Sequence, residues 1–209
     1  KYSVSNYKKP DLFKLSLACL KGLNFYQRTP LMKSIRELSL ICSKNFNSNK
    51  YHDQHHFKAV LLLASVFAKV SQLKQIDNLL VVILSLTHDM SHQGRRVIKK
   101  PYYQEKKTIK HLEKIIFKKI LNQQTWNRIK RILLNTYFPV IPEKSSDIVE
   151  KIILNADLAS SIIFGKKNGL ILTRRLKNEI NFKDKSINLY SKFIGNLDKR
   201  DLSLIKNNF

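Results

Sequence analysis

The chain has 209 residues, the size of one domain, and 43% of them are hydrophobic. This composition is enough to bury a core and excludes a disordered basic tail. The formal net charge of +24 suggests nucleic acid, a membrane surface or small anions as partners. The longest apolar runs, 59–68 and 79–86, are shorter than the roughly 20 residues of a membrane helix. We therefore expect no membrane insertion in this segment and a cytoplasmic protein whose two cysteines are buried and reduced.

The positive charge is unevenly distributed along the chain. Residues 51–94 are neutral and hold five of the six histidines, whereas residues 95–131 carry a net charge of +11. Lys outnumbers Arg by 30 to 9, and Asn and Ile are abundant, which indicates a compositional bias as much as a selected surface. The charge alone therefore does not define the function, although it is compatible with a funnel for an anionic phosphate ester.

Apolar residues recur at three- to four-residue spacing in almost every part of the chain, which predicts helices rather than strands. In chain order the apolar stripes cover residues 12–20, 31–41, 60–70, 79–86, 109–120, 129–133, 148–159 and 170–197. Pro30 suits the first turn of the second helix, Asp77 is the predicted N-cap of the fourth, and the segment Ser145-Ser146-Asp147 is predicted to cap the seventh. Residues 94–104 and 138–146 are predicted loops.

The sequence thus predicts a single all-α domain of eight or nine helices over 1–209. We divide it into N-terminal helices (1–45), a core with a metal site (46–165) and C-terminal helices (166–209).

Three polar clusters interrupt the apolar stripes: Tyr51-His52-Asp53-Gln54-His55-His56, His88-Asp89-Met90-Ser91-His92 and Asn155-Ala156-Asp157. Taken singly, a helical histidine is more often a hydrogen-bonded structural residue than a metal ligand, and a lone aspartate can lie at the surface. Taken together, two carboxylates follow helices that must be buried, and burying them unpaired costs several kcal/mol each. A divalent ion held by two carboxylates and two imidazoles relieves this cost and suits Zn, Mn, Fe or Mg.

In this order the three clusters resemble the signature of HD-domain phosphohydrolases, and most of all class I 3',5'-cyclic-nucleotide phosphodiesterases. That family carries Tyr-His-Asn-x-x-His-Ala, His-Asp-x-x-His-x-Gly and His-Ala-Asp-Leu-Ser. This chain has Tyr-His-Asp-Gln-His-His-Phe at 51–57, His-Asp-Met-Ser-His-Gln-Gly at 88–94 and Asn-Ala-Asp-Leu-Ala at 155–159. The similarity spans roughly residues 46–165.

The resemblance implies an all-helical fold and two divalent metal ions. Four residues match the ligands of the first ion, namely His56, His88, Asp89 and Asp157. Asp89 would bridge to a second ion that water and phosphate complete.

Three further residues take roles by resemblance. His52 matches the general acid, His92 matches the histidine that contacts the bridging hydroxide and the phosphate, and Glu105 is the loosest match, to a glutamate that supports the water network. Metal ions lower the pKa of a bound water and stabilise charge on the phosphoryl oxygens. An imidazole four residues from a ligand can then protonate the leaving group.

The chain departs from the family at Asp53 and Val97, where the family has Asn, and at Asn155, where it has His. No equivalent of the purine-binding Gln can be placed, and His55 and His111 are interpreted as structural or surface residues. The predicted function is therefore a metal-dependent phosphohydrolase with a small anionic nucleotide as substrate, foremost a 3',5'-cyclic nucleotide. The alternatives are another substrate, guanosine tetraphosphate or a nucleoside phosphate, or a non-catalytic HD module that binds RNA or an acidic partner. Such a module would use the basic residues of 95–131, including Lys106, Lys110, Lys114 and Lys118. Nothing in the sequence indicates an oligomeric state.

Overall fold

The computed structural model describes residues 11–25, 29–45, 49–95, 100–117, 121–137, 147–163, 165–181, 183 and 186–199. Within these ranges the chain is helical and contains no strand, so the predicted all-α fold is confirmed. The helices are α1 (Leu12–Gly22), α2 (Thr29–Asn45), α3 (Gln54–Val70), α4 (Gln75–Thr87), α5 (Tyr103–Leu112), the π-helical segment η1 (Glu113–Phe117), α7 (Gln123–Asn135), α8 (Ile148–Ala159), α9 (Lys166–Ile180) and α10 (Ser186–Lys199). The predicted loop 138–146 and residues 96–99 of the other predicted loop lie outside the described residues.

Short polar side chains set where several helices begin. Asp53 precedes α3 and accepts a hydrogen bond from the backbone N–H of His56, and Asp147 caps α8 as predicted. Pro30 lies in the first turn of α2, also as predicted. The prediction for Asp77 was wrong, because α4 already begins at Gln75 with Lys74 as its N-cap residue. Asp77 instead lies in the first turn of α4 and forms an ion pair with Arg128 of α7.

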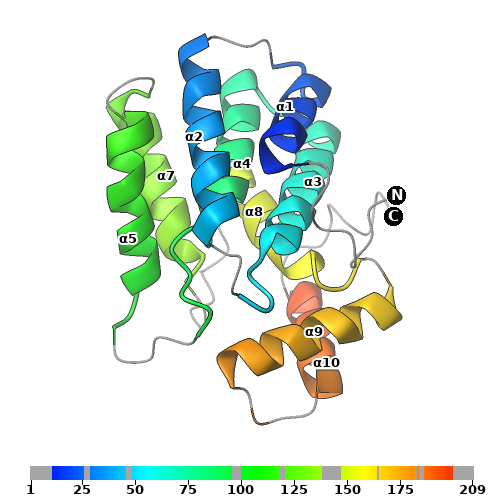
Figure 1. Cartoon of the computed structure of the whole chain (residues 1–209). Coiled ribbons are helices and arrows are strands. Elements are labelled where there is room, and N and C mark those ends of the chain that lie inside the picture. The colour runs from blue at the N-terminus through cyan, green and yellow to red at the C-terminus, as the bar shows by residue number, and fades with distance from the viewer. Residues whose placement is uncertain are drawn as a thin grey trace.

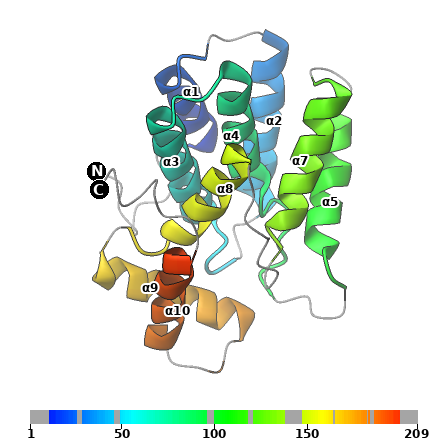
Figure 2. The ribbon, with the colours of Figure 1, turned by 180° about the vertical axis from the view of Figure 1, so that it is seen from behind.

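The core is built around α4. Every residue of α4 from Asn78 to Thr87 is buried, and α4 packs against α1, α2, α3, α7 and α8. Figures 1 and 2 show α4 in the middle of the bundle, with α1 and α3 on one side and α5 and α7 on the other. This arrangement explains the uninterrupted apolar run of the sequence, because a helix surrounded by neighbours has no solvent face.

The pair α9 and α10 covers one end of this bundle (Figure 1). Leu172, Leu176 and Leu189 of the pair form a small apolar cluster with Tyr51, which lies three residues before the start of α3. The pair therefore lies against the segment that carries His52.

Both cysteines are free and buried. The thiol of Cys42 donates a hydrogen bond to the Leu86 carbonyl over 2.9 Å, and burial raises its pKa above the ordinary value. Among the described residues, no helix combines the length and the apolar character that crossing a bilayer requires.

Candidate metal centre

Three helix ends bring together the four residues that the sequence predicts as metal ligands. His56 lies in the first turn of α3, His88 and Asp89 follow the last turn of α4, and Asp157 lies in the last turn of α8. These helices pack closely on one another, so residues far apart in sequence meet. One nitrogen or oxygen atom from each of the four lies within 4.8 Å of the others.

Four of the five distances between ligand atoms in this cluster are those of a coordination shell. His56 Nε2 lies 3.1 Å from His88 Nε2, 3.4 Å from Asp89 Oδ2 and 3.3 Å from Asp157 Oδ1. His88 Nε2 lies 3.1 Å from Asp89 Oδ2 and 3.9 Å from Asp157 Oδ1. Ligand atoms about 2.0–2.2 Å from one ion are separated by about 3–3.6 Å in octahedral or tetrahedral geometry. The four residues therefore fit a divalent ion with little rearrangement.

The hydrogen bonds behind the two imidazoles orient them for ligation. His88 Nδ1 lies 3.1 Å from the Ser85 carbonyl, which can only accept, so the ring hydrogen is on Nδ1. Ser160 Oγ donates to the Asp157 carbonyl over 2.6 Å and therefore accepts from His56 Nδ1, 3.3 Å away. The Nε2 atom of each ring therefore faces the carboxylates, where it donates a hydrogen when protonated and can ligate a metal ion when deprotonated.

Burial differs across the cluster. The side chains of His56 and His88 are almost inaccessible, whereas those of Asp89 and Asp157 are 20% and 33% exposed. Solvent reaches the cluster from the carboxylate side. Burial alone would lower the pKa of His56, but hydrogen bonds to Asp157 and Asp89 raise it to about 10. Burial likewise opposes ionisation of Asp89, yet His88 and His52 hold its pKa well below the ordinary value. The two carboxylates thus attract positive charge to this point.

A second group of three side chains lies beside the first. His52 Nδ1 is 2.5 Å from Glu179 Oε1, and the rings of His52 and His92 stack with their centroids 3.7 Å apart. The other Glu179 oxygen accepts from the backbone N–H groups of Tyr51 and His52, over 2.6 and 3.2 Å. His52 Nε2 lies 3.5 Å from Asp89 Oδ2, which links the two groups. One nitrogen or oxygen atom from each of His52, His92 and Glu179 also lies close enough to the others to hold a metal ion.

At neutral pH the Glu179 carboxyl group is ionised, whereas the His92 imidazole is uncharged. Burial would raise the pKa of Glu179, but the hydrogen bonds from His52 and from the Tyr51 N–H, with the nearby His92, lower it to about 2. Burial and the adjacent His52 lower the pKa of His92 to about 4. The Gly94 N–H donates to His92 Nδ1 over 3.1 Å, so neutral His92 carries its hydrogen on Nε2.

Sequence reasoning missed Glu179, which lies 127 positions from His52 in the chain. It occupies an apolar stripe of α9, seven residues after Leu172 and three after Leu176, and all three are buried. A carboxylate on an apolar stripe was the available signal, the same one that singled out Asp157. The contact of Glu179 with His52, however, depends on how α9 packs against the segment before α3.

Glu105 lies in the first turn of α5 and belongs to neither group. Its side chain is buried, and Oε2 has no hydrogen-bond partner within the part of the chain that the structure describes. Burial, with a smaller effect of the Asp89 charge, raises its pKa to about 7. The structure thus places a buried carboxyl group within the electrostatic reach of Asp89 and does not include it in the cluster.

The departures from the family pattern have local explanations where the structure describes them. Asp53 is the N-cap of α3, a place that Asn and Asp fill equally well. Asn155 is buried in α8 and donates to the Lys151 carbonyl over 2.8 Å. His55 is buried and His111 is exposed, and neither belongs to a ligand group. Val97 lies outside the described residues.

The chain matches no protein-family model, and a search of curated proteins finds no significant match. The proposed function therefore combines the geometry of the two groups of side chains with the sequence motifs at 51–57 and 88–94.

Proposed function

We propose that the protein is a metal-dependent phosphohydrolase and that its substrate is a 3',5'-cyclic nucleotide. One observation supports this above all: the ligand cluster and the His52–Glu179 pair meet at Asp89, with His52 Nε2 3.5 Å from Asp89 Oδ2. A proton donor beside a metal-ligand carboxylate is what hydrolysis of a phosphate ester requires.

The proposed ligands of the first ion are His56, His88, Asp89 and Asp157. Two imidazoles with two carboxylates suit Zn, Mn, Fe or Mg. When bound, divalent ions lower the pKa of water and stabilise the charge of phosphoryl oxygens. The proposal includes a second ion at Asp89, with water and phosphate completing its shell.

His52 is the proposed general acid. Glu179 remains ionised at neutral pH and holds a hydrogen on His52 Nδ1, so Nε2 is the atom directed toward Asp89. Protonated His52 can donate from Nε2 to the leaving oxygen, and the Glu179 carboxylate stabilises the imidazolium before the transfer. Neutral His92, stacked on His52, can donate its Nε2 hydrogen to a phosphate oxygen.

The choice of a cyclic nucleotide as substrate rests on the sequence motifs at 51–57 and 88–94. Another nucleotide, such as guanosine tetraphosphate or a nucleoside phosphate, is the alternative substrate. A binding module is the alternative class, and the exposed side chains of Lys106, Lys107 and Lys110 on α5 favour it.

A hydrolysis screen of cyclic and linear nucleotides, with Mn, Mg, Fe or Zn added, tests the proposal. We expect turnover of a cyclic nucleotide, and loss of both bound metal and turnover in His88→Ala and Asp157→Ala. His52→Gln should retain the metal but lose roughly 10²–10⁴-fold in turnover, because only proton donation is removed. His111→Ala, which changes an exposed histidine, is the matched control.

A protein that binds no divalent ion and hydrolyses none of these esters would contradict the enzymatic proposal. RNA binding that weakens steeply with salt and is lost on neutralising Lys106, Lys107 and Lys110 would then support the binding module.

A further inference from the structure

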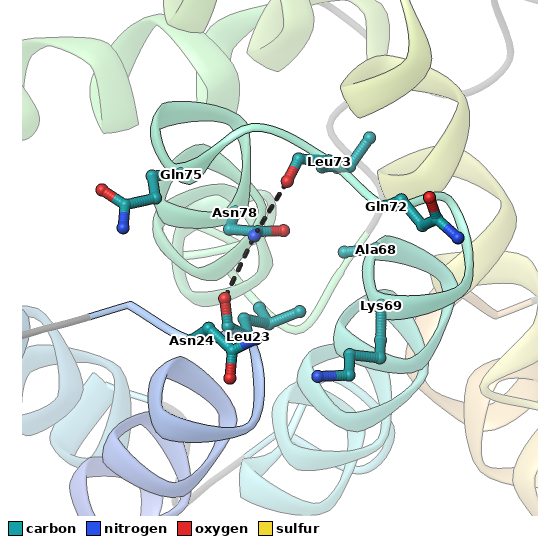
Figure 3. A pocket seen from close by; sticks show the side chains of 8 residues that line it. All are labelled: Leu23, Asn24, Ala68, Lys69, Gln72, Leu73, Gln75 and Asn78. Carbon is teal, nitrogen blue, oxygen red and sulfur yellow. Dashed lines mark hydrogen bonds between the residues drawn. The ribbon is translucent and has the colours of Figure 1, made fainter.

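A cavity lies at the opposite end of α3 and α4 from the metal ligands. It is an open depression with a volume of about 310 Å³, lined by the residues that follow α1, the last turn of α3, the α3–α4 turn and the start of α4 (Figure 3). Lys69 of its lining and His56 of the metal cluster are 13 residues apart on α3, which corresponds to about 20 Å along the helix. The cavity is therefore separate from the proposed active site.

The side chain of Asn78 provides an acceptor that the protein does not use. Asn78 Nδ2 donates to the Leu23 and Leu73 carbonyls, over 3.2 and 3.3 Å. Both partners can only accept, so the amide cannot be flipped and Oδ1 faces away from them, on the side of Ala68 and Gln72 (Figure 3).

Asn78 is 6% exposed, and Oδ1 has no partner among the described residues. A buried acceptor left unsatisfied costs about 1–3 kcal/mol. A donor group that reached Oδ1 from the cavity, after a small movement of the side chains around it, would recover that energy.

The charge around the cavity favours an anion. Lys69 is the one charged side chain among the described lining residues, and it uses one of its three hydrogens on the Gly22 carbonyl, 2.9 Å away. The start of α4 borders the cavity at Gln75 and has no side-chain cap, so the positive end of its helix dipole lies near the cavity.

We infer that this cavity is a second ligand site, for a small hydroxylated anion of the sugar-phosphate class. One hydroxyl donates to Asn78 Oδ1, and the phosphate lies near Lys69. Asn24, Gln72 and Gln75 contribute side-chain amides, and amides match hydroxyls because both donate and accept hydrogen bonds. The volume is at the small end of ligand pockets, which suits a molecule of metabolite size and excludes a folded partner.

The probe is ribose 5-phosphate. It is titrated into the full chain that carries Asp157→Asn and has been treated with a chelator, so that the metal cluster contributes no phosphate binding. Calorimetry should show saturable binding that is tighter than for ribose or for inorganic phosphate alone. In a nitrogen–proton NMR spectrum, the side-chain amide signals of Asn78 should shift during the titration.

Lys69→Gln should weaken binding about tenfold or more, whereas Lys110→Gln, which neutralises an exposed lysine of α5, should leave it unchanged. Asn78→Leu would remove the acceptor, but it would also remove the hydrogen bonds to the Leu23 and Leu73 carbonyls. Gln72→Gly therefore serves as the second variant, and it should weaken binding without unfolding the chain. Gln72 has a φ of 50°, which glycine adopts without strain. No binding at 10 mM probe, binding that Lys69→Gln does not change, or shifts confined to residues near the metal cluster would each overturn the inference.

Discussion

Replacing Glu105 with glutamine should make the protein more stable at high pH. Glu105 is 7% exposed and Oε2 has no partner in the described part of the chain, so its ionised form is poorly solvated in the folded state. Burial and the Asp89 charge raise its pKa from 4.5 to about 7. A pKa higher in the folded state than in the unfolded state means that stability present below pH 4.5 is lost as the pH rises through 7. At 1.36 kcal/mol for each pH unit between these values, the loss is about 3 kcal/mol.

Urea unfolding of the metal-free protein at pH 4 and pH 8.5 measures this effect. Glutamine has the same shape and cannot ionise, so the free energy of unfolding of Glu105→Gln should exceed that of the parent by about 3 kcal/mol at pH 8.5. At pH 4 the two should be nearly equal, because glutamate is then largely protonated in both states. Glu113→Gln, at an exposed position eight residues later, should change stability by less than about 0.5 kcal/mol at either pH. If Glu105→Gln is no more stable than the parent at pH 8.5, a partner stabilises the ionised Glu105 carboxylate, and the group is not buried unpaired.

Other substitutions test the capping, the core and the Glu179 contacts, each by urea unfolding. Phe67→Ala should cost about 3–5 kcal/mol because the ring is buried, whereas Val66→Ala, 41% exposed, should cost less than about 1 kcal/mol; equal costs would contradict the assigned face of α3. Glu179→Gln should lose about 3 kcal/mol at pH 7, since the folded pKa of about 2 lies below the ordinary 4.5, and the loss should shrink as the pH falls from 4.5 toward 2; a loss independent of pH would refute the ionic contact. Asp147→Asn keeps the cap of α8 but weakens the ion pair with Arg128, so Asp147→Ala should cost about 1 kcal/mol more than Asp147→Asn.

Much of the fold follows from the sequence because helices depend on near neighbours. The spacing of apolar residues predicts the all-α class, and the run from Leu79 to Leu86 predicts a buried helix, as α4 is. The predicted capping segment 145–147 contains the true N-cap, Asp147, because the cap depends only on the N–H groups of Val149 and Glu150 just after it. The same local logic failed for Asp77, which also suits a first-turn position, and the structure uses it to bind Arg128 of another helix.

For the site, the sequence by itself determined which residue types were out of place in apolar stripes, and these include His56, His88, Asp89 and Asp157. Only the tertiary structure decided that their atoms meet within 4.8 Å, that Glu179 of α9 reaches His52, and that Asn78, whose Oδ1 has no partner among the described residues, lines a cavity. The physical reason is that capping and periodicity act over a few residues. Contacts across 30 to 130 positions instead depend on how whole helices pack, and that packing is set by all their side chains together.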